Sequence, residues 1–92
     1  MYIVWDPDKA WINLKKHGIT FEEAQTVLAS EAQLILEDNN YREQRFIALG
    51  ISMNLNLLVV VYCYREEDLV RIISARRATR RERKFYEERI RF

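Results

Sequence analysis

The sequence of 92 residues contains one cysteine, one proline and two glycines. A lone cysteine, Cys63, excludes an internal disulfide and fits a reducing compartment, and its apolar surroundings predict that it is buried. So few glycines and prolines leave no flexible linker. The longest apolar run, LLVVVYCY, has the length of a strand rather than of a membrane span. With no recognisable signal peptide, we expect one cytoplasmic domain over residues 1–92.

Several kinds of catalytic site are also missing. One histidine and one cysteine are too few for a zinc site of the usual kind. The sequence has no glycine-rich loop to hold a nucleotide, and Ser74 lacks the nucleophile elbow of a serine hydrolase. The acidic residues show no spacing that indicates a metal pair, so we expect no metal and no cofactor. RNA can be cleaved without a metal, because its own 2′-hydroxyl can attack the adjacent phosphate.

What the sequence does contain is a concentration of arginine at one end. Residues 71–92 hold nine Arg or Lys and three Glu, whereas residues 1–70 hold six basic and eleven acidic side chains. The formal charge of the whole protein is only +1. Guanidinium groups stay ionised and bind phosphate oxygens in pairs. We therefore expect this end to hold an RNA backbone and to stabilise charge that develops on phosphorus.

A first helix is predicted between Asp6 and Gly18. Asp6 is a good N-cap and Pro7 suits the first helical position, while Gly18 can take the left-handed conformation that ends a helix. Its apolar positions at helical spacing are Ala10, Trp11 and Leu14.

Two further helices are predicted from the spacing of a capping box. Thr20 and Glu23 begin the second helix, which continues with an apolar stripe to about residue 28. Thr79 and Glu82 begin the third, which runs to about Ile90.

The residues between the second and third helices predict strands joined by short turns. The predicted strands cover residues 33–38, 42–52, 55–65 and 69–78, with one turn at Asp38–Asn40. The third of these is apolar on both faces, so it should lie in the middle of the sheet. In the last strand, alternation places Ser74 and Arg76 on the face of Val70 and Ile72, and Arg77 on the other face.

These elements predict an α+β fold. Short turns favour antiparallel neighbours, so we expect an antiparallel β-meander of about four strands, with two N-terminal helices and one C-terminal helix. Residues 2–5, YIVW, form a further short β-prone segment at the start of the chain.

The arginines near the end of the last strand are the first candidates for a functional site. Arg76 and Arg77 end this strand beside a helix N-terminus, and Arg80 follows them on the helix. Arg65 ends the central strand, so in a meander it lies near the start of the last strand rather than its end. The alternative interpretation is a solvated helix with ion pairs, and we favour it for the residues from Arg83 onwards.

His17 is the one histidine, so any imidazole acid or base must be this residue. Its structural alternative is to offset the dipole at the end of the first helix. Trp5 and Trp11 can stack on bases, but aromatic residues beside a small core are more often packed there, and we favour packing. Tyr86 carries the same two interpretations.

Two separated motifs resemble one known family. The segment WDPDKAWINLKKHGITFEEA resembles the opening of the BrnT family of toxins, through Trp5, Asp6, Lys9, Asn13, Lys16, His17, Gly18, Phe21 and Ala24. The segment RIISARRATRRERKFY resembles the ending of the same family, through Arg71, Ser74, Ala75, Arg76, Ala78, Glu82 and Tyr86. The similarity spans essentially the whole chain, in the same order.

The resemblance implies a toxin of a type II toxin–antitoxin system with a RelE-like fold. Such toxins are ribonucleases that inhibit translation until a BrnA-type antitoxin binds them. The antitoxin usually carries a ribbon-helix-helix domain, and the assembly is typically a pair of toxins on an antitoxin dimer. Operator DNA is then bound only through the antitoxin.

The resemblance also selects among the candidate site residues. It favours His17 and Arg76, with Lys9 and Lys16 beside them, and Arg65 matches a basic position at the end of the central strand. Glu82 has a competing role as a helix cap. The predicted catalytic residues are therefore His17, Arg65, Arg76 and Glu82, and the predicted RNA-binding residues are Lys9, Lys16, Arg77, Arg80 and Tyr86.

We expect His17 and Arg76 to converge on a single cleft of a metal-independent endoribonuclease. Two other functions fit the same sequence. The basic end could dock another protein in a DNA-binding repressor complex without any catalysis, or the chain could be a gyrase-directed toxin on the same kind of fold. Intact RNA in a cleavage assay would favour either of these two.

Overall fold

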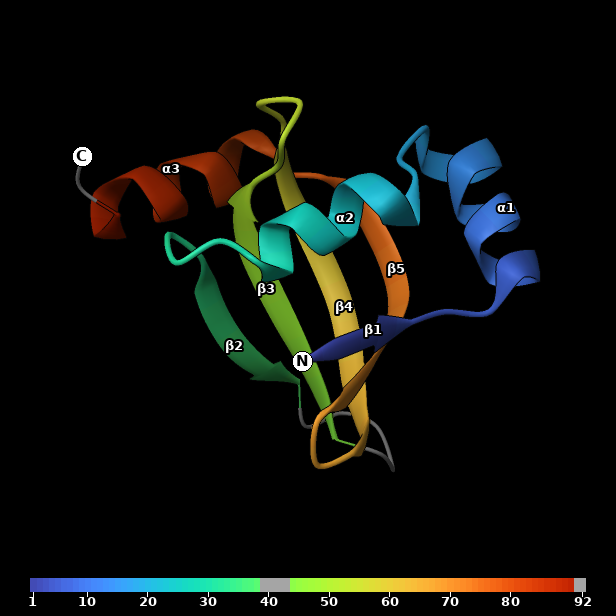
Figure 1. Cartoon of the computed structure of the whole chain (residues 1–92). Helices are drawn as coiled ribbons and strands as arrows, with labels where there is room; N and C mark the ends of the chain where they lie inside the picture. The colour runs from blue at the N-terminus through green and yellow to red at the C-terminus, as the bar shows by residue number, and fades with distance from the viewer. Residues whose placement is uncertain (39–43, 91–92) are drawn as a thin grey trace.

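The computed structural model describes residues 1–38 and 44–90 and has an α+β fold (Figure 1). The elements in chain order are β1 (Tyr2–Val4), α1 (Pro7–His17), α2 (Phe21–Leu28), β2 (Leu34–Asp38), β3 (Arg45–Ile51), β4 (Leu57–Glu66), β5 (Leu69–Arg77) and α3 (Arg80–Arg89). The predicted fold class is confirmed. The predicted turn residues Asn39 and Asn40 and the first residues of the predicted second strand, 42 and 43, lie outside the described residues.

Within the described residues the strands form one sheet, in the order β1-β5-β4-β3-β2. The strands β2 to β5 make the predicted antiparallel meander, and the apolar strand β4 lies in its middle. The sheet also has a fifth strand, because β1 pairs in parallel with the start of β5, Tyr2 opposite Leu69. The prediction of a purely antiparallel sheet was therefore incomplete. Parallel pairing joins segments far apart in the chain, so local sequence does not indicate it.

The predicted helix ends are confirmed. At the start of α1, the Asp6 carboxylate accepts a hydrogen bond from the backbone N–H of Asp8 (2.9 Å), and Gly18 ends the helix with φ 72°. At the start of α3, Thr79 and Glu82 form the complete capping box. At the start of α2 only half of the predicted box forms. The Thr20 hydroxyl accepts from the backbone N–H of Glu23, but the Glu23 carboxylate turns elsewhere.

The Glu23 carboxylate holds the loop between β3 and β4. It is buried, and it accepts hydrogen bonds from the Ser52 hydroxyl (2.6 Å) and the Asn56 amide (2.8 Å). Burial alone raises the pKa of Glu23, but these hydrogen bonds outweigh burial and lower the pKa overall. A charged group can therefore stay ionised inside the fold and fix α2 against the top of the sheet.

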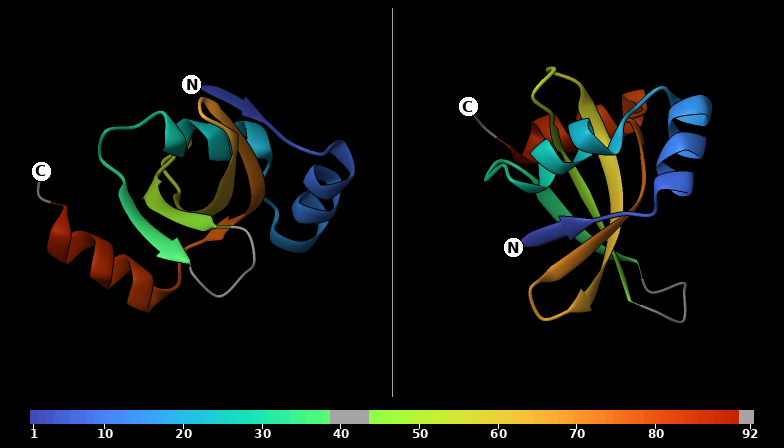
Figure 2. Two further views of the ribbon diagram at one scale, coloured as in Figure 1. Left: turned by 90° about the horizontal axis from the view of Figure 1, so that it is seen from below. Right: turned by 45° about the vertical axis from the view of Figure 1, so that its right-hand side comes forward.

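Helices cover the sheet on both faces (Figure 2). On one face α2 packs through Phe21, Ala24 and Val27, and this core includes Tyr62 and Ile72 of the sheet. On the other face α3 packs through Tyr86 and Phe85 against the smaller cluster around Leu49 and Val59. Cys63 is buried, as predicted. None of the helices in residues 1–38 and 44–90 reaches the length and apolar character that crossing a membrane requires.

The helix α1 lies beside β5 rather than over the sheet (Figure 1). It buries Asn13, whose amide donates to the carbonyl oxygens of Ala75 (2.8 Å) and Ile19 (3.0 Å). The Asn13 carbonyl oxygen in turn accepts from the backbone N–H of Ala75 (3.1 Å). This one side chain makes the pair of hydrogen bonds that another strand would make with the edge of β5, beyond the point where β1 ends.

A β-bulge in β5 changes which side chains face which layer. Ser74 is paired with Val61 and Ile72 with Tyr62, so Ile73 is an extra residue in β5. Ala75 therefore joins Val70 and Ile72 in the core beneath α2. The regular alternation predicted for this strand is wrong beyond Ile72, because a single extra residue exchanges the two faces. As a result, the arginines at the end of β5 have exchanged faces as well.

Candidate functional site

A cationic pocket lies between α1 and β5, and we call it the α1 pocket. It has a volume of about 190 Å³ and contains the predicted site residues Lys9, Lys16 and His17. The remaining lining residues are Ile12, Asn13, Ile73 and Ser74. Lys9 and Lys16 lie seven residues apart, two helical turns, and so share one side of α1 with Asn13 between them. The bulged residue Ile73 and its neighbour Ser74 form the opposite wall.

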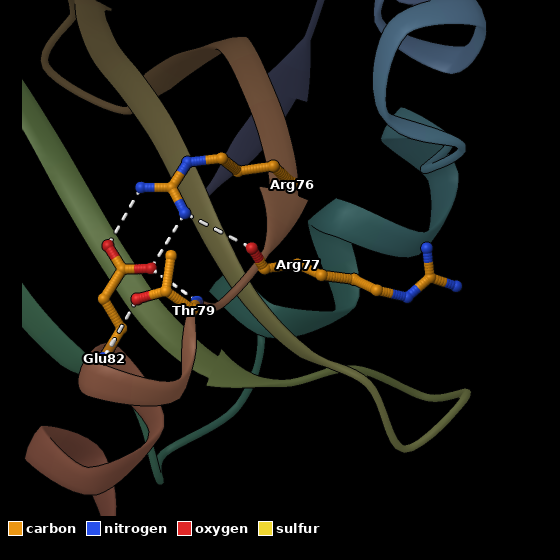
Figure 3. Close-up of polar contacts among 4 residues, drawn as sticks. All are labelled: Arg76, Arg77, Thr79 and Glu82. Carbon is orange, nitrogen blue, oxygen red and sulfur yellow. Dashed lines mark hydrogen bonds and ion pairs between the residues drawn. The ribbon is translucent and has the colours of Figure 1, made fainter.

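Arg77 approaches this pocket from the end of β5. A Cβ placed on Gly18 would lie 3.9 Å from Arg77 Nη1, so the guanidinium passes next to the residue that follows His17. Figure 3 shows the Arg77 side chain extending away from Arg76, toward α1 and α2. Arg77 is paired with Leu58, which belongs to the core beneath α2, so Arg77 lies on the α2 face of the sheet. The His17 imidazole, the Lys16 ammonium and the Arg77 guanidinium thus lie near the end of α1, whereas Lys9 lines the pocket from the first turn of the helix, about 12 Å away along the axis.

Arg76 points the other way, toward α3 (Figure 3). Its guanidinium donates two hydrogen bonds to the Glu82 carboxylate, at 2.8 and 2.9 Å, and a third to the Arg77 carbonyl oxygen at 3.2 Å. The backbone N–H of Thr79 donates to the same carboxylate at 2.8 Å. The hydrogen bonds from Arg76 lower the pKa of Glu82 to about 2, and the pKa of Arg76 is raised by the same contact. Both side chains therefore remain ionised across the physiological pH range.

A groove beneath α3 contains this ion pair, and we call it the α3 groove. It has a volume of about 270 Å³. Its lining is mainly apolar, with Leu36, Ile47, Leu49, Val59 and Phe85 beside Arg76, Arg81 and Glu82. Glu82 neutralises Arg76. Among the described residues that line the groove, Arg81 is then the cation that forms no ion pair. Such a lining suits apolar side chains better than the phosphates of RNA.

The predicted single cleft is wrong. His17 belongs to the α1 pocket and Arg76 to the α3 groove, on different sides of β5. The bulge at Ile73 is the cause, since it brings Arg77 to the α1 side and turns Arg76 to the α3 side. Arg77, predicted only to bind RNA, occupies the place that we expected Arg76 to take.

The other predicted site residues lie apart from the α1 pocket. Arg65 is close to the end of β4, four residues beyond Val61, which is paired with Ser74 of the pocket wall, so it lies about 13 Å farther along the strand at about 3.3 Å per residue. Arg80 is exposed on the first turn of α3. Tyr86 is buried, and its hydroxyl donates to the Ala32 carbonyl oxygen (2.7 Å), so the structure does not support the predicted RNA contact there.

Sequence reasoning missed the part of Asn13 and Ile73 in building the pocket. Asn13 belongs to the motif that resembles the family, but we expected no role for it. The signal that could have revealed its role is an amide side chain at a buried position of a short helix. A buried amide needs hydrogen-bond partners, and here those partners are the edge of β5. Ile73 gave no signal of its own, because a bulge depends on pairing across the sheet rather than on the bulged residue.

Comparisons with known proteins agree with the fold and the motifs. Residues 5–82 match a family model described as "Ribonuclease toxin, BrnT, of type II toxin-antitoxin system". The crystal structure of the Brucella abortus ribonuclease toxin BrnT is similar to this chain, with a TM-score of 0.71 and 24% sequence identity over 87% of this chain and 99% of that one. At that identity the likeness supports the fold alone. No curated protein matches the chain significantly.

The family model covers most of the chain and includes the α1 residues and the Arg76–Glu82 pair. The predicted resemblance is therefore confirmed, and the chain belongs to the BrnT family of ribonuclease toxins of type II toxin–antitoxin systems.

Proposed function

We propose that this protein is a metal-independent endoribonuclease whose catalytic centre is the α1 pocket. The observation that carries the proposal is the position of His17, the one imidazole of the sequence, in a pocket with Lys9 and Lys16 and next to Arg77. Imidazole groups transfer protons near neutral pH, and fixed cations stabilise negative charge on phosphorus. These are the two requirements of RNA cleavage by its own 2′-hydroxyl.

The proposed reaction is a displacement at phosphorus. The 2′-oxygen loses its proton and bonds to the adjacent phosphorus, and the bond from phosphorus to the 5′-oxygen breaks, with a proton delivered to that oxygen. The products are a 2′,3′-cyclic phosphate and a 5′-hydroxyl end. His17 moves one of the two protons, while Lys16 and Arg77 stabilise the charged phosphorane and Lys9 binds a neighbouring phosphate.

Arg76 and Glu82, which we expected to be catalytic, have a positioning role in this proposal. Both oxygens of Glu82 are engaged by Arg76 and Thr79, and a carboxylate with a pKa of about 2 is a weak base at neutral pH. The pair joins the end of β5 to the start of α3 and so fixes the backbone position from which the Arg77 side chain extends. Arg65 lies too far along β4 to reach the same phosphate.

The proposal is tested by cleavage of RNA by the purified protein in EDTA. We expect fragments that end in a 2′,3′-cyclic phosphate, and we expect His17→Ala to lower the cleavage rate by about 10²- to 10⁴-fold, the usual contribution of a general acid or base. The spectrum and melting temperature of the variant should stay close to those of the wild type, because His17 is a half-buried residue at a helix end. RNA that stays intact in EDTA but is cleaved with added Mg²⁺ would remove the metal-independent mechanism.

The family also implies an antitoxin partner. We propose that it is a BrnA-type protein with a ribbon-helix-helix domain, that two toxins bind an antitoxin dimer, and that the complex reaches operator DNA only through the antitoxin. We further propose that toxin released in the cytoplasm inhibits translation by cutting RNA. A neighbouring reading frame for a small ribbon-helix-helix protein would support the partner, and its co-expression should relieve growth arrest.

We assign the antitoxin contact to the α3 groove. The groove has an apolar lining, and Arg81 lies beside it with Arg80 exposed on the same turn of α3. This combination is complementary to a segment with apolar and acidic side chains. Under this assignment Arg81→Glu lowers antitoxin affinity, because it repels acidic side chains of the antitoxin at an exposed position of the groove, and leaves RNA cleavage by free toxin unchanged.

A further inference from the structure

The outer side of α1 exposes large apolar side chains. Trp11 is 61% exposed, Ile12 58% and Leu14 42%. We expected Trp11 to pack beside the core, and the structure corrects this, because α1 lies beside β5 and turns Asn13 inward instead. Adjacent exposed apolar groups on a small protein mark a binding surface.

A second pocket opens on this side of α1, and the two tryptophans of the sequence line it. Its volume is about 270 Å³, close to the lower end of the range of about 300–1,000 Å³ for small-ligand pockets. Trp5 is fixed in the pocket by an edge-to-face contact with Phe21, at 6.0 Å between ring centroids. The other lining residues are Pro7, Ala10, Leu14, Thr20 and Glu22. Trp5 is therefore packed as predicted, whereas Trp11 is available to a ligand.

The charged side chains around the exposed indole carry both signs, with Lys15 against the ring, Glu22 in the pocket lining and Asp8 one helical turn before Trp11. The Lys15 ammonium lies 5.1 Å from the centre of the Trp11 ring, and Lys9 and Lys16 lie on the other flank of α1, in the α1 pocket. Glu22 is one of the residues that line the pocket of the two tryptophans, so a phosphate is disfavoured inside it. An aromatic surface flanked by lysines is the arrangement that binds single-stranded nucleic acid, with bases on the rings and phosphates on the cations.

We propose that Trp11 is a base-stacking subsite for single-stranded RNA, which rests on the proposed ribonuclease function and extends it. One base stacks on the indole in the tryptophan pocket while the backbone crosses the exposed side of α1 past Lys15. The scissile phosphate lies in the α1 pocket on the other flank. The two pockets are separated by the width of a helix, about 10 Å, and about three stacked nucleotides at 3.4 Å each cover this distance.

The net positive charge of α1 as a whole favours RNA over a protein as its partner. The helix carries three lysines and one acidic residue, Asp8, and the sides of the same helix form both pockets. A protein that covered Trp11, Ile12 and Leu14 would also cover Lys15, which lies against the Trp11 ring. A single strand uses the rings and the lysines together.

The test is binding of a 2′-O-methylated RNA nonamer of mixed sequence, which cannot be cleaved through its 2′-oxygen. In Trp5→Phe, Trp11 is the remaining tryptophan, and its fluorescence should be quenched saturably as the nonamer is added, with an affinity that falls as salt is raised. In the otherwise wild-type chain, Trp11→Ala should bind the fluorescently labelled nonamer about 5- to 100-fold more weakly, whereas Trp11→Phe should retain part of the affinity. Tyr2→Ala is the matched control, since Tyr2 is an aromatic residue on β1 that is even more exposed than Trp11.

The outcomes separate this inference from the proposed function. If Trp11→Ala binds the nonamer as tightly as the wild type, the subsite does not exist, even where the wild type cleaves RNA in EDTA. If Trp11→Ala keeps its RNA affinity but loses binding to the antitoxin or to a second copy of the chain, the surface is a protein interface and the inference is overturned. If Trp11→Ala weakens binding but the wild type cleaves no RNA, the subsite stands and the proposed catalytic function fails.

Discussion

The α1 side and the α3 side of β5 differ in how they use arginine. On the α1 side, Arg77 extends from the strand end to the residue after His17, in a region that also contains Lys9 and Lys16. On the α3 side, Arg76 is held by a carboxylate, and the surrounding groove is mainly apolar. Neighbouring residues of identical chemistry therefore have opposite surroundings. The local sequence RR does not distinguish them, and the pairing of β5 with β4 does.

The largest expected effect comes from removing each arginine side chain in turn, which tests whether Arg77 and Arg76 differ in their contribution to RNA cleavage. Arg77→Ala should lower RNA cleavage by about ten- to a hundredfold, because it removes a cation that stabilises the transition state. Arg76→Ala should lower cleavage per folded molecule less than Arg77→Ala does, since the Arg76 guanidinium binds Glu82 and acts only through the position of Arg77. The measurement is the initial rate of cleavage in EDTA, normalised to the folded fraction.

The matched control for this pair is Arg77→Lys, which keeps the charge but loses the planar fork and should retain part of the rate. A larger loss of cleavage in Arg76→Ala than in Arg77→Ala would place the catalytic centre in the α3 groove. It would then restore the originally predicted roles of Arg76 and Glu82.

A second comparison concerns how the two helices are attached to the sheet. α3 is joined by an ion pair and apolar packing, whereas α1 depends on the buried Asn13 amide. Asn13→Leu should lower the free energy of unfolding by about 2–4 kcal/mol, because it leaves the buried N–H and C=O of Ala75 without partners. It should also lower cleavage, since the α1 pocket loses its alignment with β5. Chemical denaturation measures the first effect.

Lys15→Leu is the control for Asn13→Leu, because it introduces the same side chain at an exposed position of the same helix. We expect it to change the free energy of unfolding by less than about 0.5 kcal/mol. If Asn13→Leu proved equally mild, the amide would not be what fastens α1 to the edge of β5.

The parts of this molecule that sequence predicted well depend on local interactions. Asp6, Gly18 and Thr79 mark helix ends because each acts on backbone groups within a few residues. The central place of β4 follows from its apolar residues on both faces. His17, Lys9 and Lys16 share a pocket because helical spacing already places them together.

The parts that sequence missed depend on contacts between distant segments. The parallel pairing of β1 with β5 joins Tyr2 to Leu69, and nothing in YIVW indicates its partner. The bulge at Ile73 is fixed by the register with β4, and it exchanged the predicted positions of Arg76 and Arg77. The exposure of Trp11 follows from the place of α1 beside the sheet, which helical periodicity alone cannot show.

The smallest expected effect is the pH dependence of the stability that Glu82 contributes on the α3 side. The folded-state pKa of Glu82 is lowered from 4.5 to about 2, so its ionised form stabilises the folded state, and this contribution is complete above about pH 4.5. It declines as the pH falls from about 4.5 to 2, where the folded carboxyl is itself protonated. Glu82→Gln should therefore be less stable than the wild type at pH 7 by about 1–2 kcal/mol. We place the effect in this range because the Arg76 and Glu82 side chains are 39% and 31% exposed.

The difference between Glu82→Gln and the wild type should already be narrower at pH 3.5 than at pH 7, as measured by urea unfolding at both values. Glu87→Gln is a suitable control, because its contact with Arg83 is a long, exposed ion pair (3.9 Å) and should contribute little at either pH. A gap between Glu82→Gln and the wild type that stayed constant from pH 7 to 3.5 would mean that the charge on Glu82 does not hold α3 to β5. The neutral capping bonds with Thr79 would then account for the attachment, and Arg76 would be freer to bind a phosphate than its ion pair indicates.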